Sequence, residues 1–146
     1  MGKYNDFRND HGAVFVSGGD AVTKTSAALD TKGMEQAIVI LFTGTMIATG
    51  TLDVKIEHSV DNSVWADLTG AVFTQKVAAD DDLMFVGEIK CNQVGVNRYL
   101  RINSVAAVAV AEHGVIMMSK NLSGHLPLVT NALPASAFNI LPPTGV

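Results

Sequence analysis

The chain has 146 residues, which is enough for one ordinary domain whose core needs no cross-links. Charged residues make up only 16% of it, the net charge is −4, and no stretch gathers lysine or arginine, so nucleic acid binding is disfavoured. Hydrophobic residues reach 48%, and such a sparsely charged domain favours assembly with other polypeptides, including copies of itself.

Nothing in the sequence suggests export or membrane insertion. The N-terminus lacks an apolar signal core, and no run approaches the 18 apolar residues of a membrane span. Cys91 is the only cysteine, so no internal disulfide is possible. We therefore expect a protein that folds in a reducing cytoplasm and does not bind membranes.

The N-terminal third predicts an arm followed by two strands. Residues 1–20 are rich in Asn, Asp and Gly and predict an irregular arm that meets a first strand near residues 13–17. Weak alternation over residues 23–29 indicates a second strand. A turn follows at residues 30–33, because Asp30 can bond to the backbone that follows it and Gly33 accepts a positive φ.

Three strands are expected in the middle of the chain. Residues 36–42 are continuously apolar, a pattern typical of a strand covered on both faces. Residues 51–58 alternate strictly, with Leu52, Val54 and Ile56 on one face. The opposite face, which carries Asp53, Lys55 and Glu57, is expected in water. Residues 64–68, with Trp65, predict a short strand.

The remaining strands are expected over residues 83–90, 98–105 and 114–120. Inward positions are Leu83, Phe85 and Ile89 in the first of these, and Leu100 and Ile102 in the second. Between the second and third, the Ala/Val tract over residues 105–111 fits either a longer strand or a loop. Residues 126–146 hold all four prolines and predict an extended C-terminal arm.

This pattern predicts an all-β fold: a single β-sandwich, jelly-roll-like or immunoglobulin-like. The sandwich is expected over residues 21–120, with a 1–20 arm and a proline-containing 121–146 arm. Apolar residues in and beside the arms are the candidate partner contacts. They are Tyr4, Phe7, Phe15, Leu126, Leu128, Leu133, Phe138, Ile140 and Leu141.

The sequence offers no catalytic, cofactor or metal site, so we expect a protein that is not an enzyme. The four histidines show no metal-ligand spacing; His58 is expected at a strand end and His113 exposed in a turn. Cys91 is expected to be a small buried hydrophobe. Residues 80–82 are three aspartates without the glycine and spacing of a calcium loop, so a solvated loop is expected.

Four short segments resemble the β-sandwich decoration, or cement, proteins of tailed-bacteriophage capsids. They fall within residues 29–120 and are L-D-T-K-G-M-E at 29–35, L-D-V-K-I-E-H-S at 52–59, F-V-G-E-I at 85–89 and N-R-Y-L-R-I at 97–102. The first leads into the apolar run, and the second is followed by D-N-S and W-A-D-L. The Ala/Val tract and the long C-terminal arm depart from the pattern.

The resemblance implies a virion structural protein, made in the host cytoplasm, that binds the outside of an icosahedral shell. Its implied partners are the major capsid protein and copies of itself, as a homotrimer or other cyclic oligomer. Two alternatives remain at this point. One is a tail or neck component of the phage, and the other is a carbohydrate-binding module centred on Trp65.

Overall fold

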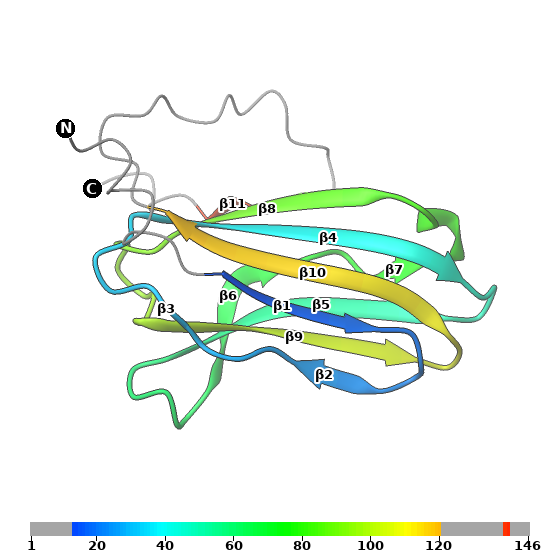
Figure 1. The fold of residues 1–146 in the computed structure, drawn as a ribbon, viewed down its shortest axis with the longest axis horizontal. Coiled ribbons are helices and arrows are strands. Elements are labelled where there is room, and N and C mark those ends of the chain that lie inside the picture. Colours follow the sequence, from blue (N-terminus) through cyan, green and yellow to red (C-terminus); the bar gives the residue numbers. More distant parts are fainter. Residues whose placement is uncertain (1–12, 121–138, 141–146) are drawn as a thin grey trace.

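A computed structural model describes residues 13–120 and 139–140, which form two β-sheets packed face to face (Figure 1). One sheet, here the β4 sheet, has the order β1 (Ala13–Gly18), β10 (Ala111–Lys120), β4 (Gln36–Met46), β8 (Met84–Lys90) and β11 (Asn139–Ile140). The other, here the β5 sheet, has the order β2 (Thr23–Thr25), β9 (Tyr99–Ala107), β5 (Thr51–Ser59) and β6 (Ala66–Val72). In addition, β3 (Leu29–Asp30) pairs with β9, and β7 (Lys76–Val77) pairs with β5.

The strand pairs are nested in the manner of a jelly roll. The first strand, β1, pairs with the tenth, β2 and β3 pair with β9, β4 pairs with β8, and β5 pairs with β6 and β7. All of these pairs are antiparallel. The chain is thus one long double strand wrapped into two sheets, which is the jelly-roll and not the immunoglobulin arrangement.

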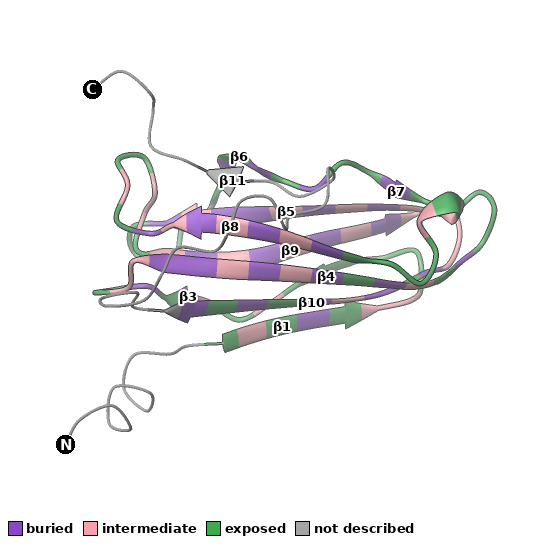
Figure 2. Cartoon of the chain, turned by 90° about the horizontal axis from the view of Figure 1, so that it is seen from above, coloured by how far each residue is buried: buried purple, intermediate pink, exposed green. Residues whose placement is uncertain are grey.

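The core lies between the two sheets. The inward residues of β4 are Ala37, Val39 and Leu41, and all are fully buried. They lie in the same core as Leu52, Val54 and Ile56 of β5, the inward set that the alternation predicts. Figure 2 shows the resulting change between buried and exposed residues along the strands.

The turn at residues 30–33 forms as predicted. The backbone N–H of Lys32 donates to Oδ1 of Asp30 at 3.0 Å, and Gly33 adopts a φ of 77°. The ambiguous Ala/Val tract divides: β9 continues to Ala107, a turn includes Val108 at a φ of 68°, and β10 begins at Ala111.

Other expectations need correction. Residues 13–18, placed within the expected 1–20 arm, belong to the sandwich, because the strand predicted near residues 13–17 forms as β1, pairs with β10 along its whole length and buries Val16. The expected C-terminal arm includes a short strand, since β11 pairs in parallel with β8 at residues 139–140. Leu83, expected inward, is 46% exposed because β8 starts only after it.

Two side chains are more buried than expected. His113 is not in an exposed turn, because β10 starts three residues earlier than the pattern suggested and turns His113 inward. There its ring nitrogens hydrogen-bond with the Ala111 carbonyl at 2.8 Å and the Ser104 hydroxyl at 3.0 Å. Glu57 is also buried, although its strand face was expected in water.

Within the described ranges the only helical segment is one 3-10 turn, η1 (Ala78–Asp80). No helix in that part of the chain has the length and apolar character needed to cross a bilayer.

Candidate protein-binding surface

The outer face of the β4 sheet is built from apolar side chains in register. The strand pairing places outward residues in three rows that run across β1, β10, β4 and β8. The middle row is Phe15, Ile116, Ile40 and Val86. The rows beside it are Ser17, Gly114, Phe42 and Met84, and Ala13, Met118, Ile38 and Glu88.

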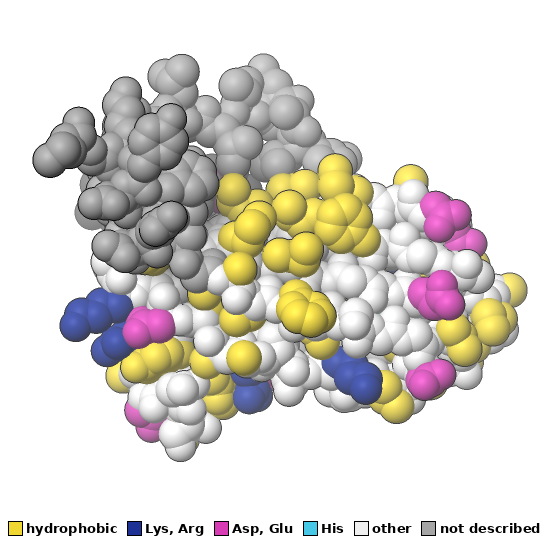
Figure 3. Space-filling model, viewed as in Figure 1, with side chains coloured by type: hydrophobic (Ala, Val, Ile, Leu, Met, Phe, Trp, Pro, Cys, Tyr) yellow, Lys and Arg dark blue, Asp and Glu magenta, His cyan; other side chains and the backbone are white. Residues whose placement is uncertain are grey.

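We call eight of these residues the apolar face: Phe15, Ile38, Ile40, Phe42, Met84, Val86, Ile116 and Met118. Several are well exposed, with 71% of Phe15, 55% of Met84 and 42% of Phe42 accessible to solvent. Hydrophobic side chains gather in the middle of the view in Figure 3. A large side chain has roughly 200 Å² of surface when it is fully exposed. Multiplying this area by the exposed fractions of the eight side chains gives on the order of 500 Å² of exposed apolar surface. A contiguous apolar patch of this size is often functional.

A shallow recess interrupts the apolar face at Gly114. Its neighbours across the strands are Ser17 and Phe42, and, apart from Gly114 and its two chain neighbours, no atom of the described residues lies within 4 Å of the position that a Cβ would take there. The face therefore has protruding side chains, such as Phe15, beside a point where a partner could come close to the backbone.

The outer face of the β5 sheet is chemically different. Glu57 accepts hydrogen bonds from Nε of Arg101 at 2.5 Å and from the amide of Asn103 at 2.9 Å. Lys55 donates to Asp67 at 2.6 Å. This face therefore satisfies its own charged groups and presents a polar surface to water.

Trp65 lies beside Arg101 on the outer face of the β5 sheet, which we call the polar face. The guanidinium of Arg101 lies over its ring, 4.4 Å from the centroid, in a cation–π contact. One face of the indole is thus occupied by a residue of the same chain. A sugar would have to stack on the other face or displace Arg101.

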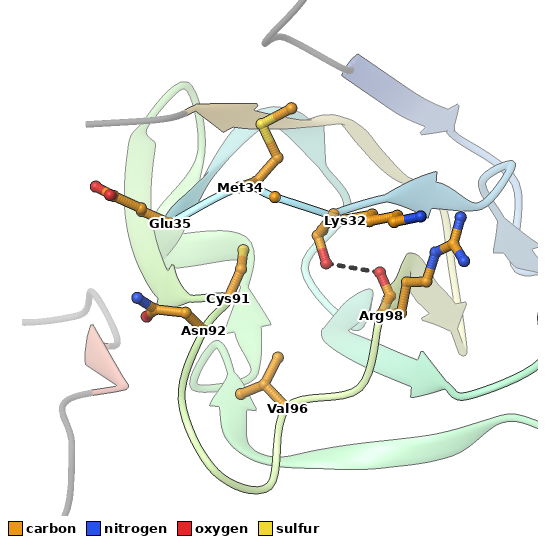
Figure 4. Close-up of a pocket in the computed structure, with 9 residues that line it drawn as sticks. Lys32, Met34, Glu35, Cys91, Asn92, Val96 and Arg98 are labelled. Carbon is orange, nitrogen blue, oxygen red and sulfur yellow. Dashed lines mark hydrogen bonds between the residues drawn. The ribbon is translucent and has the colours of Figure 1, made fainter. Parts of the chain in front are cut away.

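A cavity of about 470 Å³ opens at one end of the sandwich (Figure 4). It is lined from the turn before β4 and from the β8–β9 connection, including Met34, Cys91 and Val96. At its mouth, Arg98 holds Asp30 through two hydrogen bonds of 2.8 and 2.6 Å, and the Thr31 hydroxyl donates to the Arg98 carbonyl.

Cys91 does not make this cavity reactive. Burial raises the pKa of its thiol to about 12, so the thiolate is scarce at neutral pH. The side chain behaves as the small buried hydrophobe that the sequence predicts.

The aspartates at residues 80–82 shape a loop. A carboxylate oxygen of Asp80 accepts from the backbone N–H of Val77 at 3.1 Å, and Oδ1 of Asp81 accepts from that of Met46 at 2.8 Å. Each of these bonds uses one carboxylate oxygen to hold the backbone of the loop. Among the described residues, no group of three His, Cys, Asp or Glu side chains is placed to hold a metal ion.

His58 also has a structural role. It is half-buried near the end of β5, where its Nδ1 accepts the backbone N–H of Asn97 at 3.3 Å. This agrees with the expectation of a strand-end histidine.

The structure places two of the nine candidate contact residues. Phe15 is in β1 on the apolar face, and Ile140 is in β11, paired with Ile89 of β8. The others, Tyr4, Phe7, Leu126, Leu128, Leu133, Phe138 and Leu141, lie outside the described residues.

Sequence reasoning missed most of the apolar face, although a signal was present. The continuous apolar run at residues 36–42 predicts a strand covered on both sides. The β5 sheet covers one side, while Ile38, Ile40 and Phe42 point away from it. The run thus already indicated apolar side chains on the outer side of this sheet as well as on its inner side.

The sequence matches no protein-family model, and no curated protein resembles it significantly. Similar solved structures include the PBSX exported protein XepA, at a TM-score of 0.55 and 14% identity over 84% of this chain. The match spans 41% of XepA. At this identity the likeness shows a shared fold.

Two further structures are more distant. The SPBc2 prophage-derived protein YomS matches at a TM-score of 0.42 and 8% identity, over 75% of this chain and 95% of YomS. A structure of Bacillus endospore appendages, described as disulfide-linked pili, matches at a TM-score of 0.40 and 13% identity. That match covers 76% of this chain and 86% of the appendage protein. These scores are too low to support a further argument.

Proposed function

We propose that this chain is a structural protein of a tailed-phage particle, and specifically a decoration protein that binds the outside of the capsid. The observation that carries the proposal is the apolar face, a surface of eight hydrophobic side chains that indicates a chain built to assemble with other polypeptides, copies of itself included. The jelly-roll topology agrees with it, because this fold serves in many capsid proteins. The resemblance of residues 29–120 to decoration proteins supports a location on the capsid.

The role we propose is mechanical and not catalytic. A protein that binds the assembled shell and not its loose subunits stabilises the shell by mass action. Weak contacts become durable when one oligomer touches several shell subunits at once. We expect Tyr4 and Phe7 near one terminus and Leu126 and Leu128 near the other to supply some of these contacts.

The test is binding of the purified 146-residue chain to phage shells that lack it, measured by co-sedimentation. We expect saturable binding and shells that resist heat better. Replacing Tyr4 and Phe7, or Leu126 and Leu128, by serine should weaken binding, whereas Val60→Ser should not, since Val60 is 71% exposed in a loop. A chain that fails to bind any shell would contradict the proposal.

Copy number separates the capsid from the tail or neck. Quantitative mass spectrometry of particles should find the chain in hundreds of copies, whereas a neck ring has about a dozen by symmetry. A count of a dozen would place the chain in the neck or tail.

A further inference from the structure

We infer that the apolar face is covered by a second copy of this chain, so that the protein assembles through its β4 sheet. The inference deepens the proposed function by naming the partner of that face. It concerns residues that the structure describes on four strands: β1, β10, β4 and β8.

The size of the face suits self-association. Each copy exposes on the order of 500 Å² of apolar surface there, so burying one such face from each of two copies removes about 1,000 Å² from water. That is near the lower end for specific interfaces, before the flanking Ala13, Ser17 and Gly114 are counted. Burying the apolar face in this way is favourable, because removing apolar surface from water lowers the free energy.

The chemistry of the face also favours an identical partner. Glu88 is the one charged residue in the three rows, so the face offers little to attract a partner of opposite charge. An identical apolar face needs no charge complement. The same surface also has protrusions at Phe15 and Met84 and a recess at Gly114, and self-complementary contacts need both.

The central experiment compares two matched lysine substitutions on opposite outer faces. Met84→Lys changes a residue of the apolar face that is 55% exposed, and Val72→Lys changes a β6 residue that is 53% exposed on the polar face. Wild type and Val72→Lys should be oligomeric by light scattering at micromolar concentration. Met84→Lys should raise the dissociation constant by at least about tenfold, since the lysine would lose its water at the interface without a partner.

A second variant tests the recess without adding charge. Gly114→Gln should not disturb the single chain, because the new Cβ meets no atom within 4 Å among the described residues, its two chain neighbours aside. It should weaken assembly as strongly as Met84→Lys if a neighbouring copy approaches the backbone there. Circular dichroism and the thermal midpoint at low concentration check that both variants fold like the wild type.

Three results would overturn the inference: a monomeric wild type, full assembly of both Met84→Lys and Gly114→Gln, or equal loss in Val72→Lys. Protection of the face from chemical labelling in a monomer would assign its cover to the chain's own residues. The shell-binding test is independent. An oligomer that binds no shell contradicts only the function, and a monomer that binds shells contradicts only this inference.

Discussion

The two outer faces of the sandwich have the same backbone pattern and opposite chemistry. On the β5 sheet, Glu57, Arg101 and Asn103 form a hydrogen-bonded group, and Lys55 pairs with Asp67. On the β4 sheet, the equivalent outward positions carry Phe, Ile, Val and Met. An antiparallel sheet in water usually has one apolar and one polar face. The β5 sheet follows that rule, while the β4 sheet is apolar on both faces.

The difference shows which surface is complete in a single chain. Charged groups that pair with one another need no partner from another chain, and truncating one of them costs stability in the isolated protein. Exposed apolar side chains contribute little to the isolated fold and much to an assembly. The two faces should therefore respond to mutation in different experiments.

The largest effect should come from neighbours on β4 that point to opposite sides. Leu41 is fully buried between the sheets, and Leu41→Ala should lower the free energy of unfolding by about 2–5 kcal/mol. Phe42 is on the apolar face, so Phe42→Ala should cost less than half as much in dilute monomer. Urea titration measures both. Equal losses at low concentration would mean that the apolar face is already covered within one chain.

A middle-sized effect is expected on the polar face. Glu57→Ala should lower the free energy of unfolding by about 2 kcal/mol, because Arg101 and Asn103 lose a buried charged acceptor. The matched control is Glu112→Ala, an exposed glutamate of β10, expected to change stability by less than about 0.5 kcal/mol. If Glu57→Ala and Glu112→Ala have the same free energy of unfolding in urea titration, the hydrogen bonds of Glu57 to Arg101 and Asn103 add no stability.

The smallest effect is a pH dependence in the β5 sheet. The hydrogen bond from Arg98 is the main cause that lowers the pKa of Asp30 from 3.8 to about 2. A lowered pKa in the folded state stabilises above the unfolded value, and that contribution disappears as the pH falls from about 4 to 2. Both groups are solvent-exposed, so the gain is small.

Urea titration of Asp30→Asn and wild type across this range tests the point. The variant should be slightly less stable at pH 7 and equal to wild type near pH 2. A difference that stays constant with pH would show that the ion pair is not its cause.

Local signals in the sequence predict much of this fold. The turn at Asp30 and Gly33 depends on side chain and backbone within four residues, and the alternation of Leu52, Val54 and Ile56 depends on one strand. Both follow from short-range chemistry. The nesting of the strand pairs does not follow from short-range chemistry, because it depends on contacts between distant strands. The sequence therefore does not distinguish a jelly roll from an immunoglobulin-like sandwich.

The misjudged residues depend on distant pairing. The sequence predicts an exposed turn at His113 because Gly114 follows it, yet the register of β10 with β4 places His113 opposite Thr43 and buries it. The strand alternation predicts that Glu57 faces water, while its burial depends on Arg101 and Asn103 of β9. The apolar face likewise needs four strands in register before it becomes one surface.

The most direct test of the central claim is hydroxyl-radical footprinting of the chain in its assembled form and as dilute monomer. We expect Phe15, Met84 and Met118 on the apolar face to be labelled several-fold less in the assembly, while Val72 on the polar face is labelled equally in both. Equal labelling of the apolar face in both states, or protection confined to the polar face, would contradict the account.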